Sequence, residues 1–107
     1  MTKRDAGTMV VIFVSQRTGA DPAGYDAAAA RMDALAAAQP GYRGVDSVRD
    51  VAGLGITVSY WADAVTAAAW RDHPEHVAIR EQGRALWYDW YTVTVSETTR
   101  AYRWTRG

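Results

Sequence analysis

Apolar residues near the start of the chain follow the period of a β-strand. Residues 8–16 (TMVVIFVSQ) are rich in β-branched side chains and alternate as a half-buried strand does. The run is too short for the apolar region of a signal peptide, and it ends in the polar residues SQR. Residues 1–7 before it are polar, so we expect them to be loose.

The next segment carries the signals of a helix. Asp21 is a suitable N-cap, and Pro22 follows at the first helical position. The dipeptide Pro40-Gly41 predicts that the helix ends at about Gln39. Its expected apolar stripe consists of Tyr25, Ala29, Met32 and Leu35.

Two strands joined by a short turn follow this helix. Residues 42–50 (YRGVDSVRD) and 54–61 (LGITVSYW) flank the turn VAG, which is the arrangement of a β-hairpin. Alternate residues of the second strand share a face. One face holds Leu54, Ile56, Val58 and Tyr60, and the other holds Gly55, Thr57, Ser59 and Trp61.

The last third of the chain begins with two helical segments. Residues 62–71 are alanine-rich and predict a helix. Asp72 is expected to cap a second helix, with Glu75 in the capping-box position three residues later. We expect that helix to run to about Leu86.

A final strand completes the pattern. Residues 87–96 predict this strand, and residues 100–104 (RAYRW) either extend it or form a fifth strand. The order β-α-β-β-α-β is the split βαβ pattern of a ferredoxin-like α+β domain. We expect a single domain over residues 1–107, with its core at about 8–104.

An antiparallel sheet with helices on one face leaves its other face bare. Apolar side chains there are poorly suited to water, and small α+β domains commonly cover such a face with a second copy. The sequence therefore predicts a homodimer. We expect Tyr91, Val93 and Val95 to lie in its interface.

The charge and the cysteine content exclude several classes of function. Twelve basic and twelve acidic side chains cancel, which argues against nucleic-acid and anionic-membrane partners. The absence of cysteine excludes disulfides, thiolate metal sites and a cysteine nucleophile. No apolar stretch approaches the roughly 18 residues of a membrane span. We expect a cytoplasmic protein.

Aromatic residues are unusually concentrated in two places. Residues 59–76 (SYWADAVTAAAWRDHPEH) contain two of the five tryptophans and both histidines. Residues 86–91 (LWYDWY) contain two more tryptophans. These clusters are either an aromatic core or the wall of a pocket for a flat, apolar ligand.

Four segments, in their order and spacing, carry a resemblance to a known family. They are VIFVSQRT, QPGYRGVDSVRD, GITVSYWADAVTAAAWRDHPEH and WYDWYTVTVSETTRAYRW. The chain resembles the antibiotic biosynthesis monooxygenase family over about residues 8–104. The resemblance implies a dimeric α+β barrel with a cavity between the helices and sheet of each protomer. It also implies oxidation of aromatic polyketides or quinols without metal or flavin.

The same family has heme-degrading relatives, whose sites resemble an Asn-Trp-His constellation. Trp70 fits the tryptophan slot, but Gln16 stands in the asparagine slot and Arg80 in the histidine slot. A neutral imidazole is the usual iron ligand, and His73 and His76 come too early in the chain for it. A heme-binding or heme-degrading enzyme is therefore the second hypothesis, and a cofactor-free enzyme is the first.

Oxygenation without a cofactor needs an electron-rich substrate such as a deprotonated anthrone or quinol, since O2 reacts slowly with closed-shell molecules. The protein must supply a flat apolar pocket, a base or polarising donor, and exclusion of water. The candidate catalytic residues are Trp70, His76 and Gln16. The candidate substrate-binding residues are Trp61, Tyr25, Ser59, His73, Arg80 and Trp87. Several of them have a purely structural alternative. The tryptophans would be core residues, the histidines would be exposed residues at a helix start, and Arg80 would be solvated or salt-bridged.

Two further expectations concern metals and catalysis. His73 and His76 are not four residues apart and lack an accompanying carboxylate set, so we predict no metal site. A non-catalytic, small-molecule-binding dimer is a further hypothesis, in which the chain's own side chains would fill the cavity. The alanine-rich helices argue mildly against that filling, because small residues leave room.

Overall fold

One antiparallel sheet of four strands forms the centre of the computed structural model, which describes residues 5–107. The strands are β1 (Met9–Arg17), β2 (Tyr42–Arg49), β3 (Leu54–Trp61) and β4 (Tyr88–Glu97). Their order in the sheet is β2-β3-β1-β4, so the first and last strands are neighbours. This is the ferredoxin-like α+β fold that the order of elements predicted.

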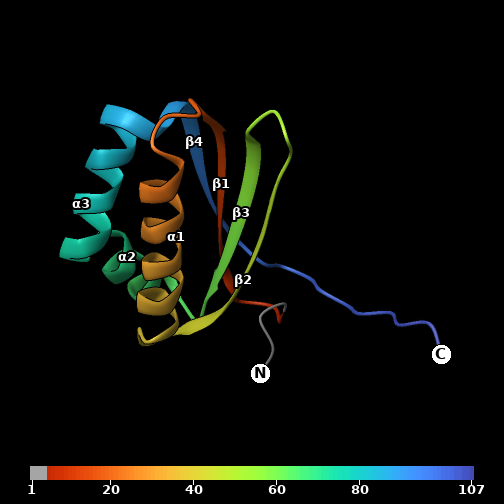
Figure 1. Ribbon diagram of the computed structural model, residues 1–107. Coiled ribbons are helices and arrows are strands. Elements are labelled where there is room, and N and C mark those ends of the chain that lie inside the picture. Colours follow the sequence, from red (N-terminus) through yellow and green to blue (C-terminus); the bar gives the residue numbers. More distant parts are fainter. Residues whose placement is uncertain (1–4) are drawn as a thin grey trace.

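Three helices cover one face of the sheet (Figure 1). They are α1 (Pro22–Ala37), α2 (Ala64–Arg71) and α3 (Pro74–Gln82). A π-helical turn, η1 (Gly83–Trp87), joins α3 to β4, so the strand begins one residue later than predicted. In the described part of the chain, no helix has the length and apolarity to cross a membrane.

The helix cap agrees with the sequence prediction at α1 and differs from it at α3. Asp21 caps α1 as predicted, because its Oδ1 accepts a hydrogen bond from the Gly24 N–H at 3.2 Å. The capping box predicted at Asp72 and Glu75 was wrong. It is formed at the start of α2, where the Asp63 Oδ1 accepts from the Thr66 N–H at 2.8 Å.

His73, rather than Asp72, caps α3. Its Nδ1 accepts a hydrogen bond from the Glu75 N–H at 3.2 Å, whereas Asp72 ends α2. The reason is Pro74, which is disfavoured behind a helical residue and holds His73 in the extended conformation of an N-cap.

The strand register determines which side chains face the helices. Trp61 packs against Trp70 of α2, with ring centroids 6.0 Å apart, so its side of the sheet is the helix face. Directly opposed residues of paired strands share a face, and Trp61 lies opposite Met9. The helix face of β1 therefore consists of Met9, Val11, Phe13, Ser15 and Arg17.

Three residues predicted for the bare face lie on the helix face instead. Val95, Val93 and Tyr91 of β4 are opposite Val11, Phe13 and Ser15 in turn. The prediction was wrong because alternation shows that the three share a face but not which face it is. Only the pairing with β1 decides that.

The opposite side of the sheet, here called the open face, is apolar. It carries Val10, Ile12 and Val14 of β1, Leu54, Ile56, Val58 and Tyr60 of β3, Val48 of β2 and Trp90 of β4. Ile56 is 43% exposed and Val48 is 71% exposed, so water reaches the centre and the edge of this face.

The core lies between the helices and β3. Trp61 is completely buried there, with Ala67 and Trp70 beside it. Met32 and Leu35 from the predicted stripe of α1 pack against this cluster. Tyr25 of the same stripe lies nearer the other end of the sheet, where its ring meets Trp87.

The chain after β4 leaves the domain without regular structure (Figure 1). The Thr98 N–H donates to the Thr8 carbonyl at 2.8 Å, which fixes the start of this segment. The strand predicted for residues 100–104 is absent, because β1 begins at Met9 opposite Glu97 and offers later residues no partner. Of the N-terminal residues expected to be loose, 1–4 lie outside the described residues and 5–7 form a turn.

Candidate functional site

A histidine and a tryptophan lie face to face on the helix side of the sheet. The rings of Trp70 and His76 are 4.5 Å apart between centroids, and their planes differ by 11°. Trp70 is near the end of α2, and His76 is in the first turn of α3. The short connection between these helices brings the two rings together.

The hydrogen bond of His76 selects one tautomer of its neutral ring. Its Nδ1 lies 3.0 Å from the carbonyl oxygen of Trp70, and a carbonyl can only accept. Nδ1 therefore carries the proton, and Nε2 keeps its lone pair. In the described part of the chain Nε2 has no hydrogen-bond partner, so it is available to accept a proton.

Burial lowers the pKa of His76 below its usual value of 6.5, because the charged ring loses solvation. The positive charge of Arg80 lowers the pKa further, while the hydrogen bond to the Trp70 carbonyl opposes the shift. His76 is consequently a neutral base at neutral pH.

Trp61 and Ser59 of β3 lie on the sheet side of this pair. The Trp61 Nε1–H donates to the Ser59 Oγ at 3.0 Å. Trp61 is completely buried and presents no surface to solvent. His73 lies at the edge of the group, with its ring centroid 5.7 Å from that of Trp70. The sequence candidates Trp70, His76, Trp61, Ser59 and His73 thus form one group.

A second aromatic group lies further along β1 on the same face. Phe13 is 5.2 Å from Tyr91 and 5.5 Å from Tyr88 between ring centroids. Tyr25 meets the edges of Trp87 and Tyr88 at 5.8 and 6.0 Å. The predicted candidates Tyr25 and Trp87 are therefore together, but in this second group. Trp87 is only 2% exposed, so it packs beneath Tyr25 and offers little surface to a ligand.

Two arginines that the sequence reasoning missed join the second group. The guanidinium carbon of Arg17 lies 3.7 Å from the centre of the Tyr25 ring. Arg49 donates from Nη2 to the Ser15 Oγ at 2.8 Å and to the Tyr25 hydroxyl at 3.2 Å. A Cβ on Gly55 would come within 2.4 Å of the Arg49 guanidinium carbon, so a larger residue at position 55 would displace this guanidinium. An arginine paired with a glycine across the hairpin was the available signal.

Tyr88 closes this group from β4. Burial raises the pKa of its phenol well above the usual value, and Tyr25 raises it further, while Arg49 and Arg17 act in the opposite direction. Tyr88 is therefore a neutral hydrogen-bonding group at physiological pH.

An apolar strip connects the two groups. Val11 and Phe13 of β1 lie beside Val95 and Val93 of β4 on the helix face. Val93 is 53% exposed and Val95 is 58% exposed, so the helices leave this strip partly uncovered. It offers a flat apolar surface between His76 and the arginines.

Gln16 and Arg80 complete the predicted set. Gln16 lies on the open face, where its Nε2 donates to the Ala52 carbonyl at 2.8 Å and holds the β2–β3 turn. It does not converge with Trp70 and His76. Arg80 is half-buried on α3, one turn after His76.

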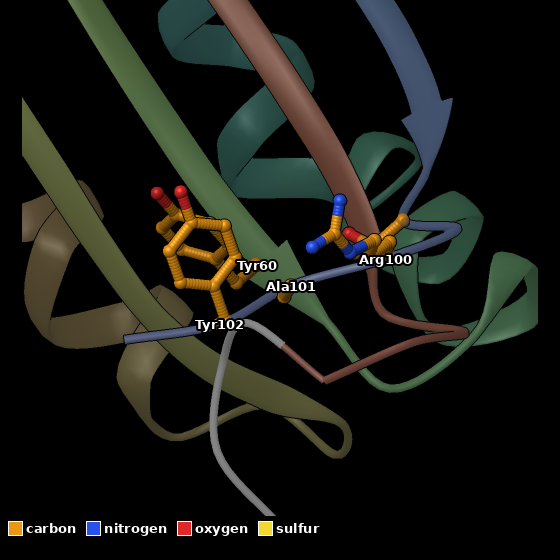
Figure 2. A pocket seen from close by; sticks show the side chains of 5 residues that line it. Tyr60, Arg100, Ala101 and Tyr102 are labelled. Carbon is orange, nitrogen blue, oxygen red and sulfur yellow. The ribbon is translucent and has the colours of Figure 1, made fainter. Parts of the chain in front are cut away.

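A shallow pocket of about 330 Å³ lies elsewhere, beside the open face (Figure 2). It is lined by Tyr60, Thr98, Arg100, Ala101 and Tyr102. None of the candidate site residues borders it, and it is wide open to solvent. Within residues 5–107, no group of three or more His, Asp or Glu side chains is placed to hold a metal ion.

Comparison with known proteins gives a family match and a close relative. The family model described as antibiotic biosynthesis monooxygenase matches residues 8–82. The uncharacterized protein YqjZ of Bacillus subtilis (strain 168) is 49% identical over 90 residues, which are 84% of this chain and 78% of that protein.

Solved structures share the fold at low sequence identity. SnoaB from Streptomyces nogalater, described as a cofactor-independent oxygenase, is 21% identical with a TM-score of 0.71, over 92% of this chain and 97% of that one. Rv0793 from Mycobacterium tuberculosis is 18% identical with a TM-score of 0.77, over 90% and 99% of the two chains.

Proposed function

Because the chain belongs to the antibiotic biosynthesis monooxygenase family, we propose that it oxidises a planar aromatic substrate with O2 and without a cofactor. The substrate class is an anthrone, a quinol or a related polyketide. The observation that carries the proposal is the neutral His76 stacked on Trp70, with Nε2 free to accept a proton. The description of SnoaB as a cofactor-independent oxygenase supports it.

The proposed reaction begins with removal of a proton from the substrate. His76 Nε2 accepts it, and the resulting carbanion or phenolate passes one electron to O2. Recombination of the two radicals forms a carbon–oxygen bond and a peroxide. For an anthrone, the O–O bond then breaks to leave a quinone carbonyl, and the second oxygen atom departs as water. His76 returns its proton in that step, so the ring ends as it began.

The protein's other contributions are placement and exclusion of water. Trp70, which is 9% exposed, stacks on the His76 ring and holds its orientation, and the strip around Phe13 and Val93 would hold the substrate. Burial keeps the His76 ring neutral, and the positive charge of Arg80 acts in the same direction. Gln16 is left out of the proposed mechanism, because its side chain holds a turn on the open face.

Oxygen uptake with a panel of anthrones and quinols tests the proposal. We expect product to form only in the presence of O2, at rates above the uncatalysed reaction. Trp70→Phe should lose on the order of 1–2 kcal/mol of stability, since an aromatic ring remains. Its turnover should fall by more than this loss explains, because the smaller ring offers His76 less stacking area and holds the base less firmly in orientation.

Trp104→Phe is the matched control, since Trp104 is 70% exposed in the segment after β4. Equal turnover by the Trp70 and Trp104 variants would show that Trp70 is only a core residue. A stoichiometric Soret-absorbing complex that releases iron with reductant and O2 would instead support the heme hypothesis.

We also propose that the open face forms the interface of a homodimer. Its apolar side chains, with Ile56 at 43% exposure and Trp90 at 48%, gain about 25 cal/mol for each Å² removed from water. Ile56→Lys should convert the dimer to a monomer in light scattering, because a charge would be buried in the contact. Val65→Lys, on exposed α2 surface, should leave the mass unchanged. A wild-type monomer at micromolar concentration would contradict the proposal.

A further inference from the structure

Arg17 and Arg49 hold positive charge on the helix face without a carboxylate partner. Ion pairs within residues 5–107 hold Arg31, Arg71 and Arg84, among others, but neither Arg17 nor Arg49. Arg17 and Arg49 are both half-buried and approach the same ring, that of Tyr25, to 3.7 and 5.6 Å. Two like charges beside one ring repel each other unless an anion joins them.

The carboxylates nearest in sequence are already engaged. Asp21 accepts from the Gly24 N–H and from the Trp87 Nε1–H, at 3.2 and 3.3 Å. Asp50 accepts from the Leu54 N–H at 3.0 Å. Neither lies within ion-pair distance of the two arginines in the described residues.

Within residues 5–107, several N–H groups of these arginines lack a protein acceptor. A guanidinium has five N–H donors. Arg17 uses one at Nε toward the Trp87 carbonyl and one at Nη2 toward the Ala20 carbonyl, so both hydrogens of Nη1 are unused. Arg49 uses Nη1 toward the Ser15 and Gly53 carbonyls, and its Nε–H is unused. Unused donors next to uncompensated charge are suited to an anionic oxygen.

The surroundings are built to hold Arg49 in this position. Ser15, which accepts from Arg49, is completely buried, and Gly55 provides the space in which the guanidinium lies. If the arginine served only to join β1 and β2, a neutral amide could donate similar bonds without the cost of desolvating a charge.

We propose that Arg17, Arg49 and the hydroxyl of Tyr25 form a binding site for the carboxylate or phenolate oxygen of an aromatic ligand. The rings of Tyr25, Tyr88 and Phe13 would contact the aromatic part of the ligand. Ser15 is four residues from Val11 along β1, about 13 Å at strand spacing, and Val11 packs against the cluster of Trp61, Ala67 and Trp70. A ligand of several fused rings would therefore reach from the arginines toward His76.

This inference rests on the proposed function in one respect only, namely that the ligand is the substrate that the protein oxidises. Binding is tested without turnover, by calorimetric titration of the full chain with 2-naphthoate and with its neutral isostere 2-naphthamide. We expect 2-naphthoate to bind at least tenfold more tightly, with an affinity that falls as salt rises. Acetate should bind far more weakly, because it lacks the rings.

Arg17→Gln should abolish the preference for the charged ligand, while the fold is checked by circular dichroism. Arg17→Lys keeps the positive charge but loses the planar set of N–H donors of the guanidinium, so it should retain only part of the preference. Arg31 of α1 is exposed and paired with Glu75 of α3, so Arg31→Gln is the matched control and should bind like the wild type.

Equal affinity for 2-naphthoate and 2-naphthamide would overturn the anion site, as would a preference that survives in both Arg17→Gln and Arg49→Gln. Acetate binding as tightly as 2-naphthoate would overturn its aromatic part. Tight binding of 2-naphthoate by a protein that oxidises no anthrone or quinol would reject the proposed reaction and keep the site.

Discussion

Trp61→Ala is expected to lower the free energy of unfolding by about 3–5 kcal/mol. The Trp61 side chain is completely buried and packs against Trp70 and Tyr42, so its removal leaves a large cavity between the sheet and α2. The Ser59 hydroxyl also loses the Trp61 Nε1–H as a donor. Urea denaturation followed by circular dichroism measures the change, and part of the population should already be unfolded without urea.

Trp104→Ala is the control for this substitution, since the same side chain is removed from an exposed position. Its effect should stay within about 0.5 kcal/mol. Equal losses in the two variants would show that the space around Trp61 collapses without cost, and would contradict the packing described for the core.

His76→Gln is expected to lower kcat by about 100-fold or more, which is the usual contribution of a general base. The amide approximates the size and polarity of the ring but cannot take the proton. In the wild type, kcat/KM should fall as the pH drops through a pKa below 6.5, because burial lowers the pKa of His76. The variant should lack this decrease. Turnover measured by oxygen uptake between pH 4.5 and 8 would give both results.

The same shift has a consequence for stability. The unfolded chain binds a proton to His76 at a higher pH than the folded chain does, so folding loses stability as the pH falls from about 6.5 through the folded pKa. Above the unfolded pKa, the stability linked to this group is fully present. Glu81→Gln, an exposed change on α3, is the control and should keep the wild-type dependence of both stability and turnover on pH. A His76 variant with unchanged turnover and the same acidic decrease would exclude the base role.

Sequence periodicity was sufficient to predict the order of elements. The strand at 54–61 and the hairpin were predicted with their observed faces, because the two-residue period of a strand is local information. The cap at His73 was missed because Asp72 is the commoner type of N-cap residue. Pro74 nevertheless fixes the backbone of the residue before it, and that residue is His73. The face of Tyr91 was missed because it depends on pairing with a strand more than seventy residues away.

The candidate site was predictable where it is local in sequence. Trp70 and His76 are six residues apart, and a short connection between helices brings them together. Gln16 comes directly after the buried Ser15 and therefore faces the other side of the sheet. Matching Gln16 to the position of the asparagine in the heme-degrading relatives did not show on which side of the sheet it lies. Arg17 and Arg49 escaped notice because their partners come from other elements.

The proposed anion site around Arg17 and Arg49 is formed by residues of four elements, so it exists only when these elements are assembled. They are Ser15 of β1, Tyr25 of α1, Arg49 of β2 and Tyr88 of β4. Local opening of any of these elements would disperse it. A ligand held there would be linked to global unfolding rather than to the fraying of one segment, and would slow amide hydrogen exchange throughout the sheet. Contacts between such distant parts of the chain also slow folding, and a refolding molecule should regain the ability to bind only together with the complete fold.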